Sequence, residues 1–157
     1  MSPTSTRGQL LNAARVLCDD FAQKRDLDVI MSHFSTTQPC IVLEHGLPAF
    51  APFLGRPFRG HEGLREYFSL IASLLDYENM CFSDYFVDPD VRKVSVKGKA
   101  RFTWKSTNES WNEVFVYVLD FDDENRVYSY QVWADTAAAY LAMKGQLGEV
   151  VPQSSSS

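Results

Sequence analysis

The segment KVSVKGKARFTWKS, from Lys93 to Ser106, decides the fold. Its even-numbered residues are apolar or small, whereas its odd-numbered residues are mostly basic. Side chains alternate between the two faces of a β-strand, so this pattern predicts a long strand with one face toward the interior and the other toward solvent.

Further strands are predicted on both sides of this segment. They span residues 77–87, 111–121 and 126–133, and the turn-rich stretches 88–90, 107–109 and 122–125 separate them. The stretch from Trp111 to Phe121 is apolar on both faces, which indicates a strand covered on both sides. Short connections between successive strands predict an antiparallel meander.

The N-terminal half has a helical pattern instead. Apolar residues recur every three or four positions in residues 6–24 and 27–34, and again in the helix that begins at Gly60. A strand is predicted at residues 40–45, and a short helix at 136–144. The order α-α-β-α-β-β-β-β-α predicts an α+β fold with the N-terminal helices packed over the concave face of a curved antiparallel or mixed sheet.

Composition and length narrow the class of protein. The chain has 157 residues, of which 45% are hydrophobic, which predicts one globular domain over residues 8–145. Residues 1–7 are expected to be a flexible N-terminus, and the Ser-rich residues 146–157 a disordered tail. A net charge of −5 argues against nucleic acid as a partner. No apolar run is long enough for a membrane span or typical of a signal peptide, so we expect a cytoplasmic protein.

Two local motifs resemble a known family. One is Gly60-His61-Glu62-Gly63-Leu64, which follows a Pro-rich loop; the other is Asp123-Glu124-Asn125-Arg126-Val127, followed by Trp133-Ala134-Asp135. With the order of elements, they resemble the SnoaL-like polyketide cyclase group of the nuclear-transport-factor-2-like superfamily over about residues 8–145. The resemblance implies a cone-shaped fold. It also implies cyclisation, isomerisation or dehydration, without a cofactor, of a hydrophobic oxygenated molecule such as a polyketide or terpenoid.

The resemblance makes Asp135 the first candidate for the acid/base residue. Asp135 also precedes Thr136 at the start of the last predicted helix, where its carboxylate would cap the backbone amides, so the two roles compete. Glu44 and His45 end the first strand, and because neighbouring side chains point to opposite faces, only one can reach a cavity. We favour His45 as the one that does so and as a second catalytic residue, with a hydrogen-bonded or solvent-facing histidine at the strand end as the alternative. Glu44 is a candidate for binding the substrate and would take the place of His45 if it points inward instead.

Other candidates would bind a substrate. Gln131 is expected to face the cavity, where it would either orient a polar atom of the ligand or bond a neighbouring side chain. The candidates for walls of a flat apolar ligand are Phe53, Phe102, Trp104 and Trp133, although aromatic residues on a sheet face more often belong to the core. Tyr117 and Tyr130 would join them only if the strand register differs by one residue. The sequence contains no set of metal ligands and no nucleotide-binding motif, so no metal or cofactor is expected.

The opposite, convex face is predicted to bury aromatic residues in a homodimer, with Phe115, Tyr117 and Tyr128 among them. The expected partners are thus a small hydrophobic molecule and a second copy of the chain. A protein of another class, a non-catalytic module that binds small molecules or proteins, remains the alternative, because a fold does not fix a function.

Overall fold

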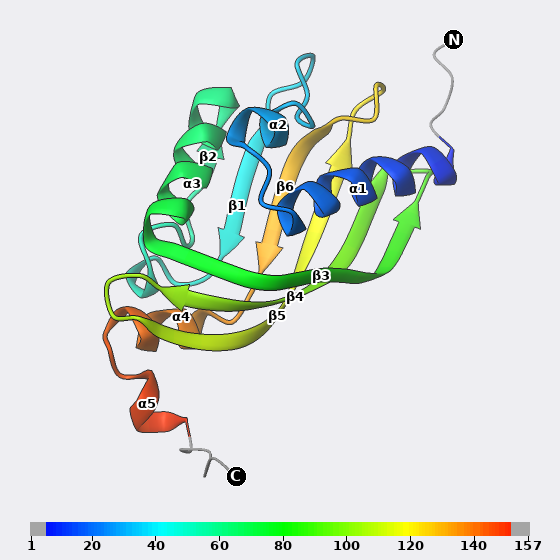
Figure 1. Ribbon diagram of the computed structural model, residues 1–157. Helices are drawn as coiled ribbons and strands as arrows, with labels where there is room; N and C mark the ends of the chain where they lie inside the picture. Colours follow the sequence, from blue (N-terminus) through cyan, green and yellow to red (C-terminus); the bar gives the residue numbers. More distant parts are fainter. Residues whose placement is uncertain (1–5, 152–157) are drawn as a thin grey trace.

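A computed structural model describes residues 6–151 (Figure 1). The helices and strands follow in the order α1 (Arg7–Ala22), α2 (Leu27–Met31), β1 (Ile41–His45), the 3-10 helix η1 (Pro48–Phe50), β2 (Phe58–Arg59), α3 (Gly60–Leu74), β3 (Leu75–Asp88), β4 (Lys93–Trp104), β5 (Glu109–Phe121), β6 (Val127–Trp133), α4 (Thr136–Met143) and α5 (Leu147–Val150). The order predicted from the sequence is confirmed, with η1, β2 and α5 in addition.

The strands form one open, mixed sheet in the order β2-β1-β6-β5-β4-β3. Only β1 and β6 pair in parallel, and the other neighbours are antiparallel. The sheet curves around α1, α2 and α3, which lie over its concave face, while α4 lies near one end (Figure 1). The predicted α+β architecture is therefore confirmed.

Helix α1 begins at a capping box, in which the Thr6 hydroxyl accepts a hydrogen bond from Gln9 N and the Gln9 side chain accepts one from Thr6 N. Its buried stripe contains Leu10, Ala14, Leu17, Cys18 and Phe21. This stripe packs against β3 and β4. Its five side chains belong to the hydrophobic core of the protein. None of the helices within residues 6–151 is long and apolar enough to cross a membrane.

Irregularities in β3 accompany the curvature of the sheet. The pairing of β3 with β4 shifts register between Glu78 and Cys81 and between Ser83 and Phe86. Asn79 and Asp84 lie inside these shifts and have φ values of 57° and 56°. Bulges of this kind bend a strand and increase its twist, so β3 can follow the helices while remaining paired.

The pairing of β4 with β5 determines which side chains face the helices. Gly98 lies opposite Phe115, and Val96 lies opposite Tyr117, and residues opposite one another share a face. A Cβ atom added to Gly98 would lie 2.3 Å from Cε2 of Phe115. The absence of a side chain at Gly98 therefore leaves room for the Phe115 ring on the concave face.

The faces predicted for β5 and β6 are wrong by one residue. Phe115, Tyr117 and Tyr130 are buried on the concave face, whereas Val114 and Val116 lie on the convex face with 55% and 36% of their surface exposed. Alternation cannot orient a strand that is apolar on both faces. The choice depends on the fit of large rings against small residues of the next strand.

One short helix, α5, lies beyond residue 145, where the sequence predicts the end of the domain. Leu147 on this helix is buried. The amides of Leu147 and Gly148 donate to the carboxylate of Glu109, which fixes this short helix against the start of β5. At the other end, Arg7 is already helical. The rest of the predicted flexible ends, residues 1–5 and 152–157, lies outside the described residues.

Candidate active site

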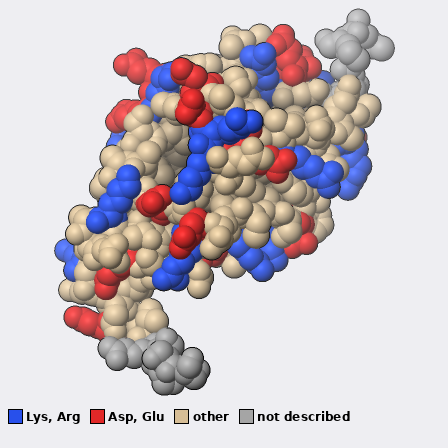
Figure 2. All heavy atoms as spheres, in the orientation of Figure 1, with Lys and Arg blue, Asp and Glu red and all other residues tan. Residues whose placement is uncertain are grey.

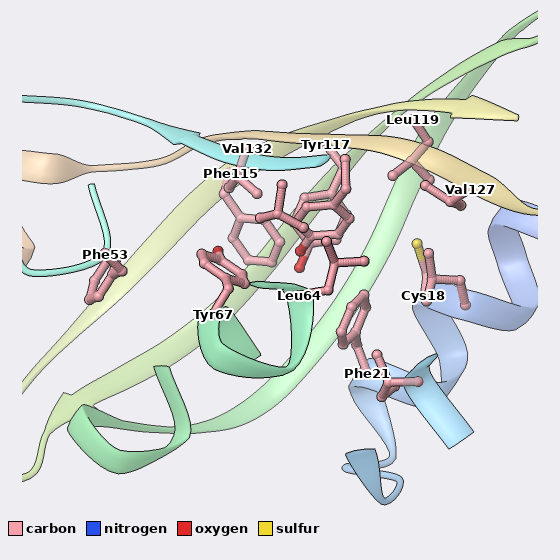
Figure 3. Packing of buried hydrophobic residues seen from close by; sticks show 14 of the residues in the cluster. Cys18, Phe21, Phe53, Leu64, Tyr67, Phe115, Tyr117, Leu119, Val127 and Val132 are labelled. Carbon is pink, nitrogen blue, oxygen red and sulfur yellow. The ribbon is translucent and has the colours of Figure 1, made fainter. Parts of the chain in front are cut away.

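A cavity of about 390 Å³ lies between the concave face of the sheet and the helices, which is within the usual size range of small-molecule sites. Helices α1 to α4 and strands β1, β3, β4, β5 and β6 all contribute to its mostly aromatic and aliphatic lining. Figure 3 shows Tyr67 of α3 facing Phe115 and Tyr117 of the sheet. Because the walls are apolar, a charged side chain in this cavity is costly.

Glu44 is one of the two buried carboxyl groups among the residues that line this cavity. It lies on β1 beside Val132 of β6, on the concave face, and exposes only 9% of its surface. The Tyr67 hydroxyl donates a hydrogen bond of 2.6 Å to Glu44 Oε1. Burial raises the pKa of Glu44 to about 7; the Tyr67 hydrogen bond opposes this shift, and the charge of Glu113 adds to it.

Glu113 is the second carboxyl group. It lies on β5 opposite Ala100 and also exposes 9% of its surface. Its Oε1 accepts hydrogen bonds from the indole Nε1 of Trp111, at 3.0 Å, and from the backbone N of Asp135, at 3.3 Å. Burial raises the pKa of Glu113 to about 7, although both hydrogen bonds act in the opposite direction.

The donors around the two carboxyl groups indicate which one holds a proton. An indole N–H and a backbone N–H can only donate, so both stabilise an ionised Glu113. The Tyr67 hydroxyl can donate to an ionised Glu44 or accept from a protonated one. When only one of the two groups is protonated, the donors therefore favour the proton on Glu44 and the ionised form of Glu113.

Three tyrosine hydroxyls complete the polar part of the cavity. The rings of Tyr117 and Tyr130 have centroids 4.9 Å apart, and the two hydroxyls are hydrogen-bonded to each other. Burial raises the pKa of Tyr67, Tyr117 and Tyr130 well above the ordinary value. These groups therefore keep their protons. The Tyr67 hydroxyl donates its hydrogen bond to Glu44, and one proton of the Tyr117–Tyr130 pair lies between the two hydroxyls, so the other hydroxyl of this pair can donate to an oxygen atom of a ligand.

The structure brings some of the predicted site residues together. Glu44, Phe53 and Phe102 line the cavity. Trp104 is buried but lies behind the lining, with its ring centroid 6.3 Å from that of Phe53. Phe53 comes from the Pro-rich segment between β1 and α3, so this segment forms part of the wall.

The convex face, outside the cavity, carries three other predicted site residues: His45, Gln131 and Trp133. Their predicted inward orientation is therefore wrong. His45 lies beside Trp133 in the parallel pairing of β1 with β6, and their rings stack with centroids 4.1 Å apart. His45 Nε2 is 2.8 Å from Gln131 Oε1. The cause is the same register error: once Val132 and Tyr130 face inward, Gln131 and Trp133 face outward.

Asp135 occupies the helix-capping position that the sequence offered as its alternative role. Its Oδ1 accepts a hydrogen bond of 3.0 Å from Ala138 N, at the start of α4. Asp135 is exposed and lies at the edge of the cavity. Its backbone N–H, by contrast, points to Glu113. The predicted acid/base role of its carboxylate stays a prediction.

Sequence reasoning missed Glu113, although a signal was present. In WNEVFVYVLDF, from Trp111 to Phe121, Glu113 shares its parity with Trp111, Phe115 and Tyr117. An acidic residue within an aromatic face is unusual, because a buried carboxyl group needs partners. Within residues 6–151, no group of three His, Cys, Asp or Glu side chains could hold a metal ion.

Comparison with known proteins identifies the fold. No model of a known family matches this sequence, and no curated protein matches it significantly. Among solved structures, a nuclear-transport-factor-2-like protein from Burkholderia pseudomallei has a TM-score of 0.71 at 17% identity, over 85% of this chain and 95% of that one. BvnE pinacolase from Penicillium brevicompactum has a TM-score of 0.69 at 17% identity, over 94% of this chain and 100% of that one.

A third similar structure is a SnoaL-like polyketide cyclase candidate from Mesorhizobium loti. Its TM-score is 0.61 at 13% identity, over 78% of this chain and 97% of that one. These likenesses, at 13% to 17% identity, concern the fold. The chain therefore has the nuclear-transport-factor-2-like fold that its sequence predicts, and the SnoaL-like polyketide cyclase candidate is among the proteins that share this fold.

Proposed function

We propose that this protein is a small acid/base enzyme that isomerises, cyclises or dehydrates a hydrophobic oxygenated molecule such as a polyketide or terpenoid. One observation carries the proposal: two buried carboxyl groups, Glu44 and Glu113, share an apolar cavity with three protonated tyrosine hydroxyls. Carboxyl groups with a pKa near neutrality are suited to proton transfer in both directions.

The proposed reaction begins with removal of a proton. Glu113 takes a proton from a carbon atom next to a carbonyl group, and the electron pair of that C–H bond moves toward the carbonyl oxygen. One hydroxyl of the Tyr117–Tyr130 pair donates a hydrogen bond to this oxygen as its negative charge develops, while the other donates to the first. Glu44 then gives its proton to another atom of the substrate, so that the product is an isomer of the substrate or has lost water.

Proton abstraction from 5-nitrobenzisoxazole tests this proposal without knowledge of the natural substrate. A base removes the C3 proton of this flat apolar compound while its N–O bond breaks, and a coloured cyanophenolate forms. We expect the purified protein to accelerate the reaction above its rate in buffer. Because Glu113 acts as the ionised base, the rate should rise as the pH increases through about 7 and then level off. A rate equal to that in buffer at every pH would contradict the proposal.

We also propose, as a separate matter, that the protein is cytoplasmic and that two copies associate through the convex face of the sheet. The residues on this face differ from those predicted, since its exposed apolar side chains include Val114, Val116 and Trp133. Val116 lies opposite Trp133 in the pairing of β5 with β6, so the three form one patch. A second copy would cover this patch with the same patch, as in most symmetric dimers.

Replacement of Val116 by Glu is expected to weaken the dimer at least about tenfold, because an unpaired carboxylate would be buried in the interface. The matched control is Val91→Glu, which changes an exposed valine in the turn before β4. Sedimentation at micromolar protein should then give a dimer for the wild type and for Val91→Glu, and a monomer for Val116→Glu. A monomeric wild type would rule out this interface.

A further inference from the structure

The opening of the cavity is basic, although the protein is acidic overall. Lys24, Arg25 and Lys105 line the cavity and are also exposed, so they lie where it meets solvent. Lys24 and Arg25 follow the end of α1, and Lys105 follows β4. Figure 2 shows charged side chains gathered at the centre of this face, where the end of α1 lies above β3.

Few carboxylates balance these three cations. Asp76 at the start of β3 lies 3.2 Å from Lys24 Nζ, and both Lys24 and Lys105 lower its pKa, so these three groups lie close together. Arg25 has a looser contact of 3.8 Å with Asp20, which His33 also binds. Asp135, which follows β6, is a further exposed carboxylate in the cavity lining. Its side chain accepts a hydrogen bond from the backbone at the start of α4, so it is not paired with these cations. Among the exposed charged side chains that line the cavity, the three cations are therefore opposed by two carboxylates, Asp76 and Asp135, so the opening has one positive charge in excess.

The interior has the opposite character. Glu44 and Glu113 hold a negative charge near neutral pH, and the walls around them are apolar. An anionic group placed there would be repelled and would lose its hydration. The same group at the opening would remain hydrated and lie beside three cations.

We propose that the substrate is an amphipathic acid that binds with its carboxylate at Lys24, Arg25 and Lys105 and its neutral, oxygenated end at Glu44, Glu113 and the tyrosines. This inference rests on the proposed function and deepens it, because it names a substrate class and an orientation. The apolar middle of such a molecule would lie against the aliphatic and aromatic wall that includes Ile71, Leu75 and Phe102.

Displacement of a neutral fluorescent dye can test the charge preference separately from catalysis. N-phenyl-1-naphthylamine serves as the reporter in the cavity. The competitors are 1-naphthaleneacetate and 1-naphthaleneacetamide, which have nearly the same shape but differ in charge. We expect the carboxylate to displace the dye from the wild type at about fivefold lower concentration than the amide, since exposed ion pairs contribute modestly. The preference should decrease in 0.5 M NaCl because salt screens exposed charges.

Variants assign the preference to the opening. The double variant Lys24→Gln/Lys105→Gln should bind both competitors equally, and Asp76→Asn should increase the preference for the carboxylate. The control Lys99→Gln removes an exposed lysine of the convex face and should behave like the wild type. Dye binding itself shows that a variant is folded, because the neutral dye does not need the cations.

Each negative result has a distinct meaning. Equal displacement by both competitors in the wild type, or an unchanged preference in the double variant, would overturn the inference and leave the proposed acid/base function intact. Absence of dye binding by the wild type would overturn both, because the cavity would then not accept an apolar molecule.

Discussion

Replacement of Glu113 by Gln is expected to lower the rate of proton abstraction from 5-nitrobenzisoxazole by about 10²- to 10⁴-fold, which is the usual contribution of a positioned general base. The amide oxygen of Gln can still accept the hydrogen bonds that Trp111 and the Asp135 backbone donate to Glu113. The variant should therefore fold normally while it lacks the base.

Two matched variants sharpen this test. Glu44→Gln should change the rate less than Glu113→Gln, because this probe needs a base but no carboxylic acid. Asp135→Asn should leave the rate unchanged, since Asn caps a helix about as well as Asp. If Asp135→Asn abolishes the activity instead, the acid/base role that the sequence predicts for Asp135 is correct and Glu113 is not the base. Activity that survives in all three variants would favour a non-catalytic binding protein.

The second large effect concerns stability and pH. Glu44 has a pKa of about 7 in the folded protein and about 4.3 in an unfolded chain. Between these values the folded state holds a proton that the unfolded state has lost, so the free energy of unfolding falls as the pH rises from about 4.3 to about 7. Above pH 7 this loss is complete, and below pH 4.3 it is absent.

Glu44→Gln removes this buried ionisation and keeps an oxygen atom that can accept the Tyr67 hydrogen bond. We expect the variant to be more stable than the wild type by about 2 kcal/mol at pH 8 and to differ little at pH 4.5. Denaturant unfolding at both pH values measures the difference. Glu66→Gln, which changes an exposed residue of α3, serves as the control and should show no such dependence. A Glu44→Gln difference that is the same at both pH values would contradict a raised pKa.

The order of helices and strands could be predicted because local patterns encode it. The alternation from Lys93 to Ser106 and the helical stripe of α1 are confirmed almost to the residue. Short elements such as β2 and α5 were missed. Two or four residues carry too little periodicity to be recognised, and their structure depends on contacts with β1 and with Glu109.

The composition of the site was harder to predict because it depends on the register of neighbouring strands. Pairing Gly98 with Phe115 turns Tyr117, Tyr130 and Glu113 inward together. A shift of one residue turns Gln131 and Trp133 outward at the same time. The same reversal explains why Glu44 and not His45 reaches the cavity. The pattern of a single strand does not show which of its faces points to the cavity. The fit of a large ring, Phe115, over Gly98 of the neighbouring strand does show it.

A ¹³C NMR titration of the glutamate side-chain carboxyl groups tests the central claim most directly, with the two signals assigned from their absence in Glu44→Gln and Glu113→Gln. The two buried groups are both expected to be largely protonated at pH 6 and to titrate near pH 7, well above the exposed glutamates, which titrate near about 4.3. If Glu44 and Glu113 instead titrate together with the exposed glutamates, neither group is held in a desolvated site, and the proposed acid/base pair is contradicted.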